Sequence, residues 1–217
     1  MATPTDTYEL LQFNMIRAHD TFKLGYEKIV TLLADPPQND IKNFLGYCEA
    51  WALSVVDHHD SEELVVFPFL NQKMDFSREE EQHKVIHDTL EKLLAIIQSA
   101  KEKPAQFKLD EMRELMVNFK EPLVVHLDEE VEHISADKLR EAQFQESEIK
   151  TMISQLEAHA KSSGNPFLQV PYMRSHTPPE YKDSWPPMPW FLRKVMIPYM
   201  LAKRYSGYWK YSPYAMS

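Results

Sequence analysis

Seven histidine and glutamate side chains in this chain have types and spacings that suit metal binding. Six form pairs four residues apart, and side chains with that spacing project from the same face of an α-helix. Imidazole nitrogens and carboxylate oxygens are common ligands of first-row transition metals. The set comprises His19, His58, Glu62, His83, His87, His126 and Glu130.

Five imidazoles and two carboxylates are too many ligands for one ion and suit two. A carboxylate has two oxygens and can bridge adjacent cations, so Glu62 and Glu130 are the natural bridges. Cys48 is the only cysteine, which excludes an internal disulfide and a thiolate cluster built from this chain. Ligands of nitrogen and oxygen favour two iron ions, with manganese or zinc less distinctive.

The elements that must position these ligands are helices, because hydrophobic residues recur at helical spacing and only four glycines occur. We predict an all-α fold, an up-down-up-down four-helix bundle. Pro68 is expected to kink or end the second helix and Pro122 to kink the fourth. Ser77 and Glu80 have capping-box spacing at the start of the third. The expected helices cover 5–34, 39–67, 77 to the turn at Pro104, and 110 through 130.

The composition changes after Gly164, where nine of the fifteen prolines lie. Residues 164–217 hold seven basic and two acidic residues, a net charge of about +5 that leaves about −14 on 1–163. We therefore predict a bundle domain over 1–163 and an extended proline- and aromatic-rich tail over 164–217 that wraps it. The expected anchors of the tail are Trp185, Trp190, Tyr205, Tyr208 and Trp209.

The ligand pattern resembles that of the hemerythrin-like proteins, whose domain is known as the HHE cation-binding domain. The resemblance covers roughly 5–135 and rests on His19, His58-His-Asp-Ser-Glu62-Glu63 with Phe67-Pro68, His83-Lys-Val-Ile-His87 and His126-Leu-Asp-Glu-Glu130. It implies that His83, His87 and His126 bind one iron. It further implies that His19 and His58 bind the other, which keeps an open position for dioxygen, and that Glu62 and Glu130 bridge the two.

Two departures from the family pattern bear on the ligands. Oxygen-carrying hemerythrins place the last carboxylate five residues after its histidine, where this chain has Val131, so the carboxylate is assigned to Glu130. His59 stands where some regulatory relatives use an extra glutamate ligand. We rank His59 as a less favoured ligand and expect it outside the metal shell or on the surface; His133 is open between a supporting and a surface role. The ending, 208–213, is similar to fungal members of the family.

Charge and hydropathy narrow the class of function. A net charge of −9 argues against a nucleic-acid surface. No apolar run is long enough to cross a bilayer and the start lacks a signal-peptide pattern, so an intracellular, soluble, cytoplasmic protein is expected. His159 and His176 are expected to be solvated.

Three functions fit the site: dioxygen binding, storage or scavenging; a di-iron oxygenase acting on a small organic substrate; and an iron or oxygen sensor. Whether the protein is an enzyme stays open.

Overall fold

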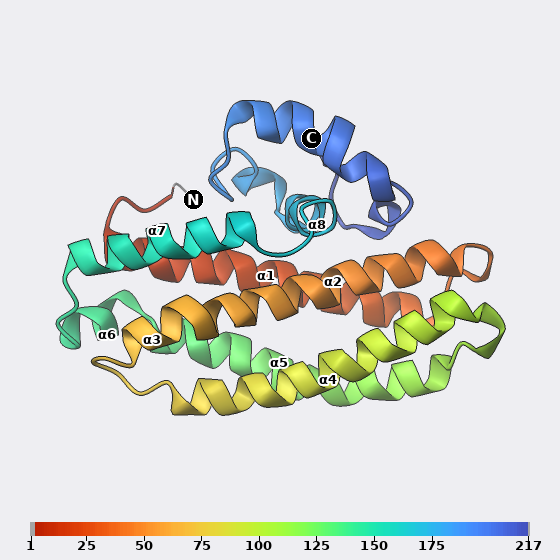
Figure 1. Cartoon of the computed structure of the whole chain (residues 1–217), viewed down its shortest axis with the longest axis horizontal. Helices are drawn as coiled ribbons and strands as arrows, with labels where there is room; N and C mark the ends of the chain where they lie inside the picture. Colours follow the sequence, from red (N-terminus) through yellow and green to blue (C-terminus); the bar gives the residue numbers. More distant parts are fainter. Residues whose placement is uncertain (1–2, 217) are drawn as a thin grey trace.

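The computed structural model describes residues 3–216, which fold into helices and contain no strand. The four long helices are α1 (Thr7–Ala34), α2 (Ile41–Ser61), α4 (Ser77–Glu102) and α5 (Leu109–His133). Along the chain α2 packs on α4, α4 on α5 and α5 back on α1, with the helices side by side in Figure 1. The predicted four-helix bundle is confirmed. None of the helices in this range combines the length and apolar character of a bilayer span.

Local signals in the sequence set most helix ends. The Asp6 carboxylate accepts hydrogen bonds from the backbone N–H groups of Tyr8 and Glu9, at 2.9 and 3.1 Å, and so caps α1. The capping box predicted at Ser77 does not form, because Phe76 is the N-cap residue of α4. Asp75 instead accepts from the backbone N–H of Ser77 at 3.0 Å. The ends of the bundle helices lie within about two residues of most predicted ones, the usual uncertainty of helix boundaries.

A single π-helical turn, Glu62–Val66, continues α2 into the short helix α3 (Phe67–Leu70). The backbone N–H of Phe67 donates to the carbonyl of Glu62, five residues back. This wider turn accommodates Pro68, which has no N–H and whose ring would clash with a carbonyl in a regular α-helix. The disruption predicted at Pro68 is therefore a widened turn just before the proline, and the helix runs on to Leu70.

Two apolar clusters fill the bundle and leave a polar layer between them. One cluster centres on Phe22, Trp51 and Phe119, and the other includes Met15 and Phe67. His19 lies between Met15 and Phe22 along α1, and the other long helices carry their predicted ligands at the same level. The fold thus places the polar side chains where the two clusters meet.

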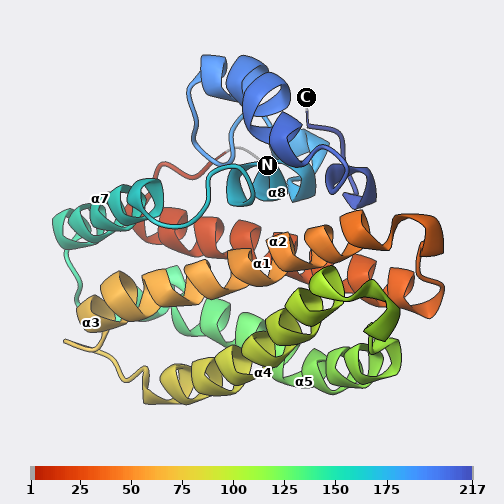
Figure 2. The ribbon, with the colours of Figure 1, turned by 45° about the vertical axis from the view of Figure 1, so that its right-hand side comes forward.

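The C-terminal part packs on the side of the bundle formed by α1 and α2, away from α4 and α5 (Figure 2). It contains α8 (Gln169–His176) and a π-helical segment (Leu192–Leu201), so it covers the bundle with helical turns where an extended chain was predicted. Before it, α6 (Ala136–Glu141) and α7 (Glu146–Ser162) lead back along α1.

Aromatic contacts attach this part to the bundle. Tyr172 donates a hydrogen bond to the carbonyl of Thr21 at 2.7 Å. His176 is fully buried, stacks on Tyr172 and lies 2.7 Å from the hydroxyl of Tyr47, so the prediction that it is solvated is wrong. Among the predicted anchors Trp185 and Tyr208 are buried. Trp190 is 64% exposed and is not an anchor.

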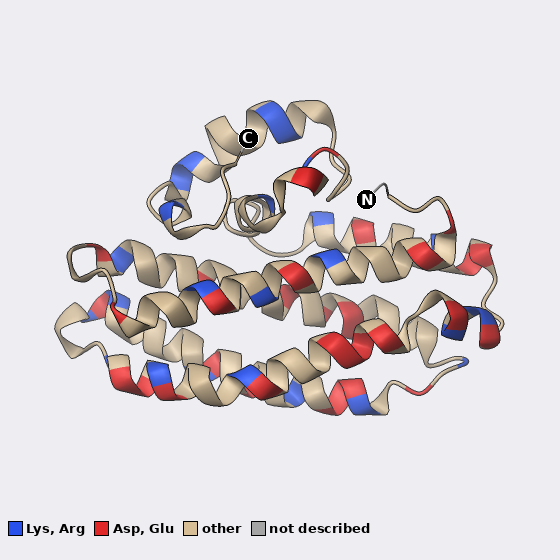
Figure 3. Ribbon diagram, turned by 180° about the vertical axis from the view of Figure 1, so that it is seen from behind, with Lys and Arg blue, Asp and Glu red and all other residues tan. Residues whose placement is uncertain are grey.

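The charge contrast predicted between the two parts is visible on the ribbon in Figure 3, where Lys and Arg predominate on the C-terminal part. Few direct ion pairs join the two parts, despite this contrast. Lys210 pairs with Asp40 at the start of α2, whereas Arg193 and Lys194 pair with Asp183 inside the C-terminal part itself. Apolar burial and hydrogen bonds therefore hold the two parts together more than charge does.

Candidate metal centre

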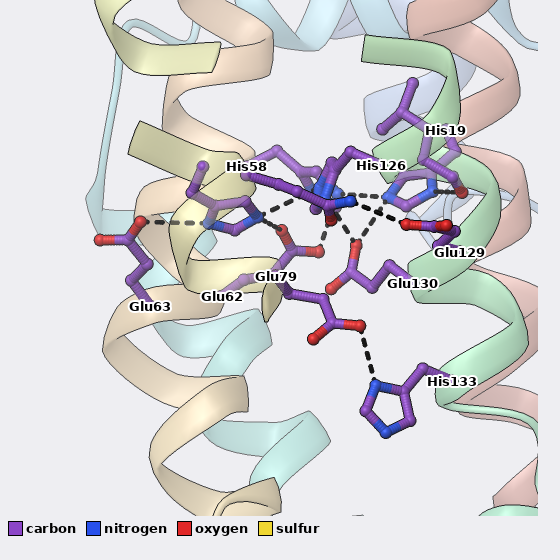
Figure 4. Close-up of polar contacts among 12 residues, drawn as sticks. His19, His58, Glu62, Glu63, Glu79, His126, Glu129, Glu130 and His133 are labelled. Atoms are coloured by element: carbon purple, nitrogen blue, oxygen red, sulfur yellow. Dashed lines mark hydrogen bonds and ion pairs between the residues drawn. The ribbon is translucent and has the colours of Figure 1, made fainter. Parts of the chain in front are cut away.

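The polar layer gathers imidazoles and carboxylates from all four long helices (Figure 4). Their metal-binding atoms form two groups, and within each group the atoms lie within 4.8 Å of one another. The open group consists of His19, His58 and Glu62. The sealed group consists of His59, His83 and His126.

The open group joins α1 to α2. The Nε2 atoms of His19 and His58 are 3.1 Å apart, and His58 Nε2 lies 2.9 Å from Glu62 Oε1. Glu62 begins the π turn, so the wide turn is part of the ligand scaffold. Single π turns occur often at functional sites because they reorient one side chain without ending the helix. The side chain of His58 is 18% exposed, whereas that of His19 is 1% exposed.

The sealed group joins α2, α4 and α5 and is closed to solvent. The Nε2 atoms of His83 and His126 are 3.1 Å apart. The ring of His59 lies 4.3 Å from that of His83 and 5.0 Å from that of His126, measured between centroids. All three side chains are fully buried.

Two buried carboxylates connect the groups. The two oxygens of Glu62 lie 2.9 Å from His58 Nε2 and 3.7 Å from His83 Nε2. Glu130 Oε2 lies 3.3 Å from His19 Nε2 and 3.7 Å from His126 Nε2. Each carboxylate therefore touches one imidazole of each group, which is the arrangement that a bridging ligand requires.

Hydrogen bonds at the outer ring nitrogens fix which inner nitrogens are free. His19 Nδ1 donates to the carbonyl of Leu127 at 2.8 Å, and His126 Nδ1 faces the Gln82 amide oxygen at 3.1 Å. His83 Nδ1 faces the Glu63 carboxylate, also at 3.1 Å. A neutral imidazole that donates from Nδ1 presents a lone pair at Nε2. The Nε2 atoms of His83 and His126 therefore direct two lone pairs at each other, a contact that a shared cation stabilises.

Burial disfavours charge on every member of the layer. It lowers the pKa of His58 to about 4, of His83 to about 2 and of His126 to about 3, so these rings are neutral at pH 7. Burial likewise raises the pKa of Glu62 and of Glu130 well above the ordinary range. None of the four carboxylate oxygens has a hydrogen-bond partner within residues 3–216. Buried acceptors without donors fit a site that is completed by cations.

His59 and His87 differ from their expected positions. His59 is buried, and neither of its ring nitrogens has a hydrogen-bond partner within residues 3–216. Of the two positions expected for it, outside the metal shell or on the surface, the surface position is therefore wrong. His87 is 28% exposed, with its Nε2 3.6 Å from Asp60, and belongs to neither group. The reason is that α2 packs between two helices. His58 faces α1, and His59, one residue on, faces α4.

The support around the sealed group was not predicted. The amide of Gln82 accepts from His126 and donates to Glu129 at 2.7 Å, and Glu129 pairs with Arg78 at 2.6 Å. This chain of contacts orients the His126 ring. Gln82 and Glu63 each adjoin a predicted ligand in the sequence, but adjacency alone does not separate them from the solvated residues nearby. His133 Nδ1 donates to the Glu79 carboxylate at 2.8 Å, one layer further down.

A cavity of about 300 Å³ adjoins the open group. His58 and Glu62 line its inner end, and residues of α1, α7 and the C-terminal part form its other walls. The sealed group does not reach it. The two groups therefore differ in access: one is buried under protein on all sides and the other faces a chamber.

Comparison with known proteins gives one family and one relative. Residues 12–136 match the family described as "Hemerythrin HHE cation binding domain". The chain is 28% identical over 184 residues to the "Dimeric xanthone biosynthesis cluster protein R11" of Cryptosporiopsis sp. (strain 8999), an alignment that covers 81% of this chain and 67% of the relative. No solved structure matches significantly. The resemblance inferred from the ligand spacing is confirmed.

Proposed function

Because the chain belongs to the hemerythrin HHE cation-binding domain family, we propose that its polar layer holds two iron ions and that the protein binds or activates dioxygen. The main support is the pair of buried carboxylates, Glu62 and Glu130, each within 3.7 Å of an imidazole from both groups and without another partner among residues 3–216.

The two groups assign the ligands of this proposal. His59, His83 and His126 would hold the sealed ion, His19 and His58 the open one, and Glu62 and Glu130 would bridge them. His87, predicted as the third sealed ligand, is the alternative to His59. Three neutral imidazoles at one ion and two at the other leave the open ion with the lower ligand count, on the side that faces the cavity.

Iron supplies the redox chemistry with dioxygen that no side chain in the layer has. The chain supplies the geometry: Leu127, Gln82 and Glu63 hold Nδ1 of three imidazoles so that Nε2 of each faces inward. Burial keeps these imidazoles neutral and free to coordinate at pH 7. Manganese or zinc would satisfy the same donors less distinctively, which makes metal identity part of the test.

The test combines metal analysis with spectroscopy. The purified protein is loaded with ferrous iron without air, its iron per chain is counted, and absorbance spectra are recorded before and after dioxygen is admitted and removed. We expect two irons per chain and a change that depends on dioxygen. A spectrum that reverses when dioxygen is removed supports binding or storage. Failure to take up iron, or spectra that are indifferent to dioxygen, would refute the proposal.

A second candidate, a di-iron oxygenase that acts on a small organic substrate, is favoured by the cavity at the open group. A site that only binds dioxygen needs no chamber of about 300 Å³ beside its open ion. The name of the relative, which refers to a dimeric xanthone biosynthesis cluster, also accords with an organic substrate. Dioxygen consumption that requires an added organic compound would distinguish this activity from reversible binding.

A further inference from the structure

The cavity at the open group is built by both parts of the chain. Met15 and Phe22 of α1 line it together with His58. Leu156 of α7 forms one wall, and Met173 and Trp185 of the C-terminal part form the other. Trp185 is buried. Residues 164–217 are therefore a wall of the chamber as well as a cover for the bundle.

Size and lining define what fits inside. An apolar cavity of about 150 Å³ holds a benzene molecule, so about 300 Å³ matches a molecule of one or two rings. Aromatic and thioether side chains, here Phe22, Trp185, Met15 and Met173, make favourable contacts with ring edges and faces. Such a lining favours a flat, apolar guest over a flexible polar one.

Without a bound cation, the lining disfavours acids. It includes the carboxyl groups of Asp57 and Glu157, and none of its residues within 3–216 is Lys or Arg. An anionic guest in the metal-free protein would be buried without a counter-charge, which is strongly unfavourable. Asp57 is one of the lining residues, and its carboxylate is an acceptor for a hydroxyl donor on the guest.

We propose that this cavity binds a neutral aromatic molecule of one or two rings that carries a hydroxyl group, and that residues 164–217 help to select it. The hydroxyl donates to Asp57, which directly precedes His58, and the rings pack between Phe22 and Trp185. Binding depends on the cavity alone. The role of the guest as a substrate rests on the oxygenase proposed above, because the guest lies against the open group.

The probe is 2-naphthol, with 2-naphthoate as the anionic counterpart of similar size. Calorimetric titration of the full-length, iron-loaded protein is expected to show one site for 2-naphthol. In the metal-free protein, where no cation offers a counter-charge, the carboxylate is expected to bind at least ~10-fold more weakly than 2-naphthol. The absence of saturable 2-naphthol binding, or equal affinity of the metal-free protein for the two compounds, would overturn the proposal.

Two variants place the binding in the cavity. Leu156→Trp fills the chamber from α7, and Ala160→Trp narrows it from an exposed position where the substitution does not disturb the core. Both are expected to weaken 2-naphthol binding at least ~10-fold by overfilling the space. Val117→Trp, at a 66% exposed position on α5, is the matched control and should bind as the wild type does. If both α7 variants bind like the control, the guest lies elsewhere and the proposal is wrong.

Repeating the titration after removal of iron by a chelator separates this proposal from the proposed function. Protein that takes up no iron yet binds 2-naphthol with the expected variant pattern keeps the cavity assignment and refutes the di-iron function. Protein that holds two irons and reacts with dioxygen but does not bind 2-naphthol keeps the di-iron function and refutes the cavity assignment.

Discussion

The open and sealed groups use nearly the same side chains in different surroundings. In the sealed group His59, His83 and His126 are all fully buried, and hydrogen bonds hold the outer nitrogens of two of them. In the open group His58 is 18% exposed and borders a cavity. An imidazole that is buried and held from behind can fix an ion, whereas one beside a chamber leaves room for a reactant.

One site can thus divide its tasks by solvent access. Both groups share Glu62 and Glu130, so neither is electrically independent of the other. In the proposed di-iron centre, the sealed half would anchor the metal pair and the open half would be the place of reaction.

The largest effect is expected from Glu130→Ala, because Glu130 contacts imidazoles of both groups. Removing it should weaken binding of both ions by more than ~100-fold, beyond the 10- to 100-fold typical of outer partners. Iron per chain, measured by elemental analysis after dialysis, reports the loss. Glu132→Ala, on an exposed face of the same helix, is the control and should keep its metal. A Glu130 variant with unchanged iron would show that the halves are not linked through this residue.

His59→Ala should remove the sealed ion while leaving the open one, so that bound iron falls to about half. His87→Ala is the matched comparison from the adjoining helix, and we expect it to retain wild-type iron because the side chain is 28% exposed and lies outside both groups. The reverse result, with His87 required and His59 dispensable, would support the ligand set predicted from the sequence instead.

Gln82→Ala tests the support behind the sealed group. The ring of His126 would lose the acceptor at Nδ1, and affinity for the sealed ion should fall ~10- to 100-fold without loss of the fold. Competition with a chelator of known affinity gives the value. The exposed neighbour Glu81→Ala should match the wild type. Equal affinities in the two variants would mean that the Gln82 contact does not orient His126.

The smallest effect concerns pH and the open group. Burial lowers the pKa of His58 to about 4 from an ordinary 6.5, so the unfolded chain takes up a proton before the folded chain does. In metal-free protein, protonation of His58 should therefore lower the free energy of unfolding by about 2 kcal/mol between pH 7 and pH 5. The loss levels off below pH 4. Thermal unfolding of wild type and His58→Gln at both pH values measures it. A variant as sensitive to acid as the wild type would contradict the assignment.

The sequence was sufficient for the four-helix bundle because helical spacing is a local signal. The ligand spacing also predicted six of the side chains that line the polar layer: His19, His58, Glu62, His83, His126 and Glu130. It could not place His59 inside the sealed group and His87 outside it. That depends on α2 packing between α1 and α4, a tertiary fact that a single-helix pattern does not contain.

The C-terminal part was the least predictable. Its prolines suggested an extended chain, but Pro171 lies in the first turn of α8 and Pro179 begins a short 3₁₀ turn, positions where proline is compatible with helix. Similarly, His176 looked solvated because its burial comes from Tyr47, which is 129 residues away in the chain. Contacts over such separations cannot be read from local composition.

The π turn at Glu62–Val66 sets the phase between the two ends of its helix. Each residue of an α-helix advances the side-chain direction by about 100°, so one extra residue shifts everything after it by about that angle. His58 and Glu62 point into the polar layer, while Val66, Phe67 and Leu70 point into the apolar cluster below it. Without the insertion, one of these two sets would rotate out of alignment. Deleting a single residue here would thus force the chain to choose between its ligands and its lower core.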